Sequence, residues 1–326
     1  MARIFCYIVH KAGVPDDSAF ELMAAARKID PSASPTAILT GRGADLDVAC
    51  KAVGVSYPEI WKIANEALAY PNAELIRKAL VKVLPNNGIV FMAHEHFGID
   101  LAPGLSIKLN SAFVSDVVNI AGIEGSALKV VRQEFGGQVS THVRCDISSG
   151  AVVTIRPGAF KPLEGAPIRG TVVDKSNDIG TLTAGRRYLE TLVAEVGDVD
   201  ITKHNVLVSI GRGIQEKDNV AIAEELAEAL GAAVSCSRPV VDAKWVEKSR
   251  QVGSSGKTVK PKVYLACGIS GAFQHLAGIK GSPFLIAINK NPKAPIFQVA
   301  DIGIVDDILE FLPEMTTKAR ELRHVA

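Results

Sequence analysis

The sequence predicts an α/β protein of two domains. Short apolar runs rich in β-branched residues alternate with longer segments of helical period, a pattern typical of parallel strands joined by helices. The chain has 326 residues, which corresponds to about two domains at ~150 residues each. Of these residues 48% are hydrophobic and 22% are charged, and no low-complexity tract interrupts them. We therefore expect two ordinary cores and a folded chain throughout.

The first domain, residues 1–200, is expected to be a Rossmann-like α/β domain. Strands are predicted at residues 3–9, 36–39 and 88–93, and helices at 18–29, 44–53, 72–84 and 100–109. Pro103 would lie near the first turn of the last of these helices, where a missing N–H is tolerated. Between residues 129 and 171, including 137–144 and 151–158, the apolar period changes to two. This change predicts a small antiparallel patch that closes the domain.

The second domain, residues 204–326, is expected to be a flavodoxin-like parallel sheet. A polar, glycine-containing segment at residues 195–204 precedes a fresh strand, so we place the boundary near residue 200. Strands are predicted at 205–210, 232–236, 262–267, 284–289 and 301–305, and helices at 218–230 and 242–250, with two more beginning at Ser270 and near Asp306.

Polar residues gather where these predicted strands end. Arg212, Ser237, Arg238, Ser270, Asn289 and Asp307 all lie at or just past the carboxyl end of a strand. In an open α/β sheet, ligands bind at that edge. The second domain therefore carries the candidate binding site.

The standard nucleotide fingerprints fail in this domain. After the turn Gly211-Arg212-Gly213, the third glycine of a dinucleotide fingerprint would fall at position 216, which is Glu216. For the segment 253–258, the first glycine of a phosphate loop would fall at position 251, which is Gln251. The small residues of the second segment could approach a flat or anionic ligand closely, although a plain flexible loop fits the pattern equally well.

Two histidine-containing patterns are ambiguous. Ser270-Gly271-Ala272 can begin a helix whose N-terminus favours negative charge, and His275 would follow in its first turns. A lone helical histidine is nevertheless more often structural. Residues 94–96, His-Glu-His, resemble a metal cluster, but no third ligand is evident nearby, so a metal site is disfavoured. No nucleophilic triad is predicted from spacing.

Composition excludes several classes of function. Lysine and arginine number 36 against 35 aspartates and glutamates, without a block of like charge, which disfavours nucleic acid and lipid surfaces as partners. No apolar run approaches the ~20 residues that cross a bilayer, and the N-terminus lacks the features of a secretory signal. The five scattered cysteines are expected to be reduced core thiols. We expect a cytoplasmic protein without membrane insertion.

Several ordered motifs together resemble one family. They are Gly211-Arg-Gly, Ser237-Arg-Pro239, the segment 252–258 (VGSSGKT), the segment 267–278 (CGISGAFQHLAG) and the segment 287–307 (AINKNPKAPIFQVADIGIVDD). In order and spacing they resemble the alpha subunits of electron transfer flavoproteins over residues 204–315. The first 200 residues resemble the family more loosely, at 100–103 (DLAP) and 155–160 (IRPGAF).

The resemblance implies an electron carrier rather than a stand-alone enzyme. Such an alpha subunit binds FAD on its C-terminal domain and pairs with a beta subunit that carries AMP or a second FAD. It takes electrons from a flavoprotein dehydrogenase, such as an acyl-CoA dehydrogenase of fatty acid beta-oxidation, and passes them to a quinone-linked or other acceptor. The FAD contacts carried over are Arg212, Ser237, Arg238, Val252, Gly253, Ser254, Ser255, Ser270, Gly271, Ala272, Phe273, Gln274, His275, Asn289, Asp307 and Ile308.

Residue chemistry fits these positions. A guanidinium at Arg238 or an imidazolium at His275 would stabilise negative charge around N1 and O2 of a reduced flavin. The Ser255 hydroxyl would reach flavin N5, where many members of the family carry threonine, and Ser254 stands where glutamine is common. Ser270 would hold the pyrophosphate, and Asn289 and Asp307 the ribityl or adenosine end.

Two other functions stay open. The chain could be a subunit of an electron-bifurcating flavoprotein in which NADH reduces a second FAD on the beta subunit. The departures from the common family residues at Ser254 and Ser255 are consistent with this alternative. A nucleotide-binding module without redox function is the third hypothesis.

Overall fold

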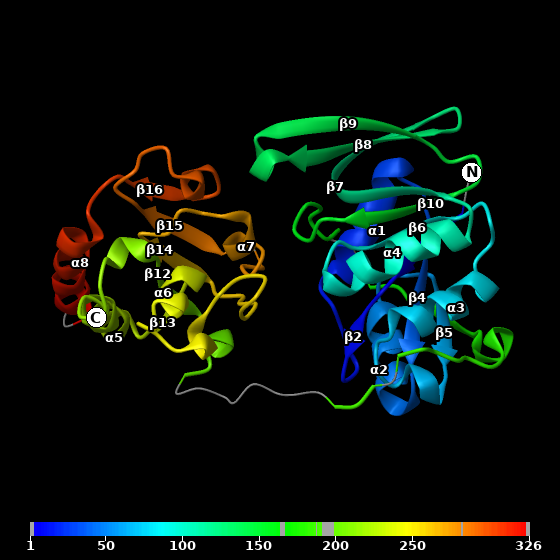
Figure 1. The fold of residues 1–326 in the computed structure, drawn as a ribbon, viewed down its shortest axis with the longest axis horizontal. Helices are drawn as coiled ribbons and strands as arrows, with labels where there is room; N and C mark the ends of the chain where they lie inside the picture. The colour runs from blue at the N-terminus through cyan, green and yellow to red at the C-terminus, as the bar shows by residue number, and fades with distance from the viewer. Residues whose placement is uncertain (1–2, 164–166, 187, 191–198, 282, 324–326) are drawn as a thin grey trace. The chain divides into compact units, whose positions relative to one another are not determined.

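A computed structural model describes residues 3–163, 167–186, 188–190, 199–281 and 283–323. Contacts divide the chain into two compact units, Met1–Glu190 and Thr191–Ala326 (Figure 1). Each unit is built on a sheet that is mainly parallel, which confirms the α/β fold class. Part of the expected boundary segment, residues 195–198, lies outside the described residues. The boundary near residue 200 stays a prediction.

The first unit contains a nine-stranded sheet in the order β11-β5-β4-β1-β6-β10-β7-β8-β9. A short hairpin stands apart from it. The strands are β1 (Ile4–Tyr7), β2 (His10–Lys11), β3 (Val14–Pro15), β4 (Thr36–Gly41), β5 (Glu59–Ala64), β6 (Ile89–Ala93), β7 (Ala112–Glu124), β8 (Ala127–Glu134), β9 (Val139–Asp146), β10 (Ala151–Ile155) and β11 (Thr171–Asp174). The helices are α1 (Ser18–Ile29), α2 (Gly43–Val53), α3 (Ala73–Val83) and α4 (His96–Lys108). Helices α1 and α2 bury apolar side chains against one face of this sheet, and helices α3 and α4 bury theirs against the other face.

The predicted antiparallel patch is only partly right. Strand β9, which contains most of residues 137–144, pairs antiparallel with β8, and β8 with β7. Residues 151–158 were wrongly included, because β10 pairs parallel with both β6 and β7. All five residues of β10 are buried, as is usual for a strand covered on both faces. Strands β5 and β7 had no counterpart among the predicted elements.

Helix α4 also differs from its prediction. It begins at His96 rather than near residue 100, so that Pro103 lies inside the helix. Leu101, Ala102 and Leu105 are buried in the core of that face. This packing holds the helix across the proline, as tertiary contacts often do against local propensity.

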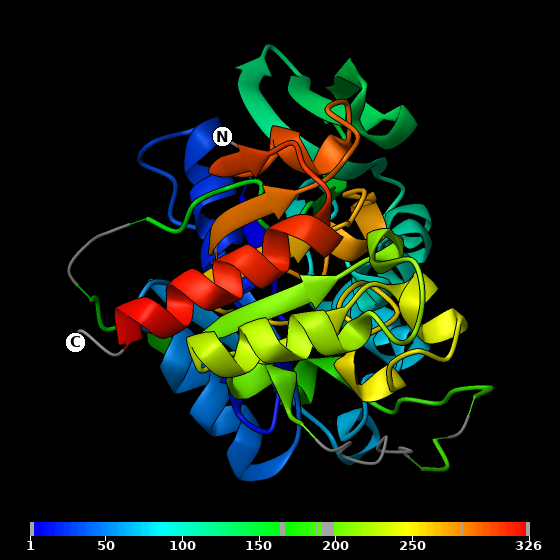
Figure 2. The same ribbon diagram turned by 90° about the vertical axis from the view of Figure 1, so that its left-hand side faces the viewer.

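The second unit is a five-stranded, fully parallel sheet in the order β13-β12-β14-β15-β16. Its strands are β12 (Val206–Ile210), β13 (Ala233–Cys236), β14 (Val263–Cys267), β15 (Phe284–Ile288) and β16 (Ile302–Ile304), and its helices are α5 (Val220–Leu230), α6 (Arg238–Asp242), α7 (Phe273–Leu276) and α8 (Ile308–Arg323). This strand order is that of flavodoxin-like folds and confirms the prediction. Helices α5 and α8 lie side by side across one face (Figure 2).

Two predicted helices of this unit are wrong in extent. The helix expected at 242–250 is instead α6, which ends at Asp242, because Lys244 has a left-handed φ of 59°. The helix expected to begin at Ser270 is the four-residue α7, because Gly271 has a φ of 85°. The region near the sheet edge is therefore mostly loop.

Three glycines, Gly211, Gly213 and Gly268, allow the segments after β12 and β14 to meet where the strand order of this sheet reverses. Residues after β12 and β14 meet through hydrogen bonds from Gly211 N to Cys267 O (2.9 Å) and from Gly213 N to Gly268 O (3.2 Å). A Cβ atom at Gly211 would lie 2.2 Å from the Gly268 carbonyl oxygen. No side chain fits that gap, so the strand ends can touch only as bare backbone.

Replacing Gly211 by alanine should therefore destabilise the second unit by about 2–3 kcal/mol, because two backbone segments must separate. Urea unfolding followed by Trp245 fluorescence, in a Trp61→Phe background, measures the change. The matched control is Gly303→Ala, whose Cβ would meet a ring atom of Phe297 at 2.8 Å. That ring can move, so the control should lose less than about 1 kcal/mol. Equal losses in the two variants would contradict the argument.

Candidate functional site

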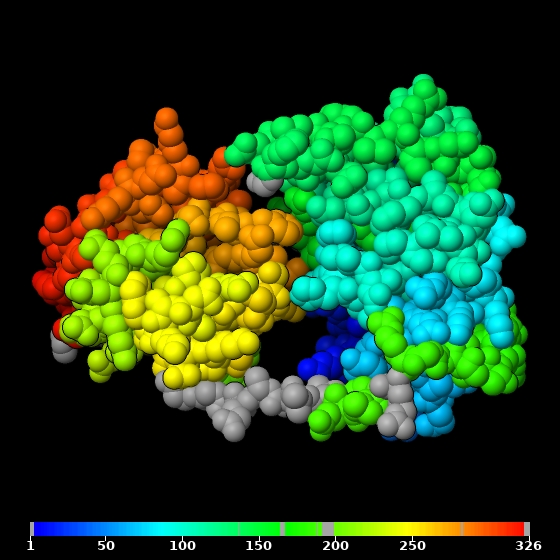
Figure 3. Space-filling model, viewed as in Figure 1, coloured from blue at the N-terminus to red at the C-terminus, as the bar shows by residue number. Residues whose placement is uncertain are grey.

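A cavity of about 610 Å³ lies at the carboxyl edge of the second sheet. Its volume is within the usual range for small-ligand sites, roughly 300–1,000 Å³. The lining residues come from the segments after β12, β13, β14 and β15, from α6 and the loop after it, from α7, and from the start of α8. They are Arg212, Gly213, Ser237, Arg238, Pro239, Gln251, Val252, Gly253, Ser254, Ser255, Gly268, Ile269, Ser270, Ala272, Gln274, His275, Asn289, Lys290, Asp306, Asp307 and Ile308. The segments around residues 240–280, yellow to orange in Figure 3, form much of this unit's visible surface.

The structure brings the expected site residues together. All sixteen line this cavity except Gly271 and Phe273. Gly271 is buried against the backbone of Ile296, where an added Cβ would lie 2.3 Å from the Ile296 nitrogen. Phe273 is 48% exposed and outside the lining set. Segments that lie far apart in the sequence thus meet at one sheet edge, as the strand order requires.

Sequence reasoning missed seven lining residues: Gly213, Pro239, Gln251, Gly268, Ile269, Lys290 and Asp306. Most are sequence neighbours of a predicted contact, and their position beside a strand end was the available signal. Gln251 was considered only as the residue that breaks a phosphate-loop fingerprint. Its role depends on a contact that spacing does not reveal.

Gln251 positions the Ser255 hydroxyl. Gln251 is only 3% exposed, and its Nε2 donates a hydrogen bond to Ser255 Oγ at 2.9 Å. Because the serine oxygen accepts this bond, the serine O–H remains a donor for another group. The backbone of the same loop is fixed by bonds from Lys257 N to Gln251 O and from Ser254 N to Gln274 O, both 2.7 Å.

Arg238 supplies an exposed cation at the cavity wall. Its side chain is 68% exposed, and its Nε lies 3.3 Å from a carboxylate oxygen of Asp242, one turn later in α6. An exposed pair of this kind contributes ~0–1 kcal/mol and holds the guanidinium only loosely. Ser237, which is 7% exposed, precedes it at the end of β13.

His275 differs from the expected imidazolium. Burial lowers the pKa of His275 to about 4, while the hydrogen bond to the Val252 carbonyl acts in the opposite direction. The ring is 6% exposed and therefore neutral near pH 7 in the protein without ligand. Its Nδ1 donates to Val252 O at 3.1 Å, and its Nε2 lies 2.9 Å from the Tyr264 hydroxyl.

The far end of the cavity is held by side-chain bonds to backbone. Asn289 Nδ2 donates to Ile269 O at 2.9 Å, and its Oδ1 accepts the Asn291 N–H at 2.9 Å. Asp307 pairs with Lys290 at 2.6 Å, and this bond lowers the pKa of the carboxyl group. Asp307 also accepts the Leu309 N–H at the start of α8. These two residues therefore shape the loops of the site.

The lining fits an extended ligand that is both flat and anionic. The loop at Gly253 packs closely against the backbone of Gln274, since a Cβ at Gly253 would lie 2.7 Å from Gln274 O. Arg212 and Arg238 supply positive charge to the lining, while Lys290 is paired with Asp307, and hydroxyls and backbone N–H groups can bind phosphate and ring oxygens. Ser270 lies in a loop, because α7 begins only at Phe273.

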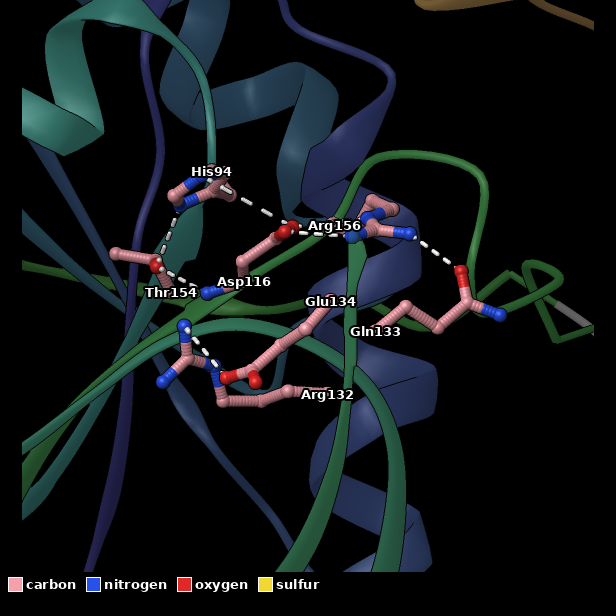
Figure 4. A network of polar contacts seen from close by, with 7 residues as sticks. All are labelled: His94, Asp116, Arg132, Gln133, Glu134, Thr154 and Arg156. Atoms are coloured by element: carbon pink, nitrogen blue, oxygen red, sulfur yellow. Dashed lines mark hydrogen bonds and ion pairs between the residues drawn. The ribbon is translucent and has the colours of Figure 1, made fainter. Parts of the chain in front are cut away.

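In the first unit, a separate polar network surrounds His94 (Figure 4). His94 Nδ1 lies 2.9 Å from Thr154 Oγ1, and its Nε2 lies 3.9 Å from an oxygen of Asp116. Arg156 binds both carboxylate oxygens of Asp116, at 2.8 and 2.5 Å. Within the described part of the chain, no three His, Cys, Asp or Glu side chains form a group that could hold a metal ion.

Comparison with known proteins identifies the family. The family model for the electron transfer flavoprotein domain matches residues 4–179, and that for the electron transfer flavoprotein FAD-binding domain matches residues 200–280. An electron transfer flavoprotein subunit alpha of Thermoanaerobacterium thermosaccharolyticum is 31% identical, with 98% of each chain covered. The chain belongs to the electron transfer flavoprotein alpha-subunit family. Its second unit contains the family's FAD-binding domain, and FAD is its cofactor.

Other relatives support this membership. The subunit alpha of Methylophilus methylotrophus is 34% identical, with 97% of this chain and 98% of the relative covered. A protein named FixB from Clostridium saccharobutylicum is 39% identical over 72% of this chain and 71% of its own length. Among the described helices, none combines the length and the apolar character that a membrane span requires.

The buried, neutral state of His275 should make the second unit sensitive to acid. The folded-state pKa of about 4 lies below the unfolded value of 6.5, so the unfolded chain binds more protons and stability falls as pH drops from about 6.5 to 4. We expect this group alone to remove about 2 kcal/mol between pH 7 and pH 5.

Urea unfolding followed by Trp245 fluorescence, in the Trp61→Phe background, tests this at both pH values. The variant His275→Gln should show a smaller loss of stability between pH 7 and pH 5 than the parent. His204→Gln removes a histidine of the same unit that does not line the cavity, and it should retain the parent's loss. If His275→Gln also retains it, His275 is not the buried neutral group described above.

Proposed function

We propose that this chain is the alpha subunit of a heterodimeric electron carrier that holds FAD in the cavity of its second unit. It would accept electrons from a flavoprotein dehydrogenase, such as an acyl-CoA dehydrogenase, and release them to a quinone-linked or other acceptor. The convergence of all expected contacts except Gly271 and Phe273 on one cavity supports this most directly. No separate substrate pocket is needed for such a role, because the donor and acceptor are proteins.

The roles proposed for individual residues follow from their contacts. Bound FAD supplies a ring that accepts and releases electrons. Arg238 supplies positive charge that is movable enough to approach the ring, and the Ser255 hydroxyl, oriented by Gln251, supplies a hydrogen-bond donor. The loop and strand-end backbone, with Ser237 and Ser270, would hold the phosphates and the remainder of the cofactor.

A second subunit completes the proposed carrier. The relatives are named as alpha subunits, and we propose a beta subunit carrying AMP or a second FAD as the partner of this chain. The second candidate function, electron bifurcation driven by NADH, is favoured by one observation. Ser254 and Ser255 replace the glutamine and threonine that are common in the family, and Ser255 accepts the Gln251 hydrogen bond without a flanking methyl group.

The heterodimer distinguishes these functions. The chain is purified with its beta partner, the flavins per heterodimer are counted, and NADH is added without oxygen. One flavin that NADH does not reduce supports the simple carrier, whereas two flavins with reduction by NADH support bifurcation. A heterodimer that neither contains FAD nor binds added FAD would leave only the module without redox function.

Removing the Arg238 guanidinium should weaken FAD binding. In the heterodimer we expect Arg238→Ala to raise the FAD dissociation constant about tenfold, or ~1.4 kcal/mol, since a charge-assisted contact is lost. The recovery of FAD fluorescence on dilution measures it. Arg320 is a matched control, because it is also an exposed arginine in a surface ion pair, with Glu225 at 3.6 Å. If Arg320→Ala and Arg238→Ala behave alike, the proposed role of Arg238 is wrong.

A further inference from the structure

Polar groups form a buried line behind the cavity wall. The Tyr264 hydroxyl on β14 lies 2.7 Å from Ser209 Oγ on β12 and 2.9 Å from His275 Nε2 on α7, and His275 Nδ1 bonds Val252 O. Ser209 and Tyr264 are 0% exposed, and His275 is 6% exposed. Of these residues, His275 and Val252 line the cavity, whereas Ser209 and Tyr264 are not among its lining residues. The line therefore connects the cavity wall to hydroxyls deep in the sheet.

Strand register places a second serine beside this line. Ser209 aligns with Ser235 on β13, and Leu207 aligns with Tyr264 on β14, so all of these side chains share one face of the sheet. Ser235 is 0% exposed, and its Oγ makes no hydrogen bond of normal geometry in the described structure. It nevertheless lies close enough to the phenol to affect the pKa of Tyr264. A buried hydroxyl without a bond is costly and needs an explanation.

Donor and acceptor rules allow two arrangements of protons along this line. The Val252 carbonyl can only accept, so His275 Nδ1 carries a hydrogen. In the neutral ring, Nε2 can only accept, so the Tyr264 O–H turns to Nε2 and away from Ser209 Oγ, the acceptor that the structure shows for it. In the protonated ring, Nε2 donates to the phenol oxygen, and the Tyr264 O–H donates to Ser209, as in the structure, or turns to the oxygen of Ser235. Only hydroxyl hydrogens turn between these arrangements.

The titratable groups nearest the line are neutral, and the Arg250 guanidinium is a charge near them, where it opposes the effect of burial on the pKa of Cys236. Burial raises the pKa of the Tyr264 phenol and of the thiols of Cys236 and Cys267, which keeps these groups neutral. Burial and the Val252 bond are the causes of the shift at His275, and no charged side chain contributes. The charged residues of the cavity wall are Arg212, Arg238, Lys290, Asp306 and Asp307.

We propose that Tyr264 is a positioning residue for His275. The Tyr264 hydroxyl holds His275 Nε2 in place, either as donor or as acceptor of their hydrogen bond, and thereby tunes the potential of the FAD bound beside the ring. This rests on the proposed function, because it places FAD in the cavity that His275 lines. In the step concerned, one proton from solvent ends on Nε2, and the Tyr264 O–H turns to a serine oxygen. No bond between heavy atoms forms or breaks, so the ring need not move when its charge changes.

The test compares Tyr264→Phe with Tyr57→Phe. Tyr57 is also fully buried, and its hydroxyl donates one bond to Ala19 O in the other unit, so the control loses a similar bond far along the chain. The first readout is the nitrogen NMR spectrum of His275 in the full chain with its partner, assigned by loss of the signal in His275→Gln. We expect the parent to show the tautomer with hydrogen on Nδ1, and Tyr264→Phe to show altered Nε2 shifts.

The second readout is the midpoint potential of the bound flavin. Tyr264→Phe should change the one-electron equilibrium about tenfold, which corresponds to about 59 mV for one electron, whereas Tyr57→Phe should leave it unchanged. Ser209→Ala and Ser235→Ala remove the other hydroxyls with little change in volume, and each should produce a smaller shift of the same sign. They also serve if Tyr264→Phe does not fold.

The outcomes separate this inference from the proposed function. Unchanged His275 signals in Tyr264→Phe, or a change of potential equal to that in Tyr57→Phe, would overturn the role of Tyr264. An unchanged potential in both serine variants, if Tyr264→Phe does not fold, would overturn it as well. A heterodimer that does not bind FAD would contradict the proposed function, and the effect on the flavin potential would fail with it. The NMR comparison would still decide whether Tyr264 positions His275.

Discussion

The site depends on how closely two parallel strands approach at their carboxyl ends. Beyond β12 and β14 the chain crosses as bare backbone at Gly211, Gly213 and Gly268. This crossing lies at the point where the strand order reverses, so the loops that follow diverge to either side and leave a hollow. A single Cβ there would push the two strand ends apart and displace the lining residues that follow them.

Sequence patterns predicted most of the second unit and its site because the relevant residues lie beside strand ends. Buried apolar runs located the strands, and the parallel order then required Ser237, Asn289 and Asp307 to meet at one edge. The errors concern elements whose ends depend on backbone conformation or distant packing. Lys244 and Gly271 have positive φ angles that no periodicity reveals, and β10 reads as alternating although both of its faces are covered.

The chemistry of the site was less predictable than its location. Whether an imidazole is charged depends on burial, and the sequence did not show that His275 would be enclosed between a carbonyl and a phenol. The same limit applies to Gln251, whose amide reaches the Ser255 hydroxyl only because residues 251–257 fold back on themselves. Residue types are visible in a sequence, but the donor or acceptor sense of each depends on its neighbours in space.

The loop 251–257 has one consequence for how such a carrier can evolve. Its shape comes from main-chain bonds, including Val252 N to Cys236 O and Lys257 N to Gln251 O, and both partners of each bond persist whatever side chains the loop carries. Exchanges at residues 254 and 255, which are exposed to the cavity, can therefore alter the electronic environment of a bound ring with little effect on folding. The affinity of the ring for electrons and the stability of the domain can thus vary separately, so one scaffold can serve partners of different redox potential.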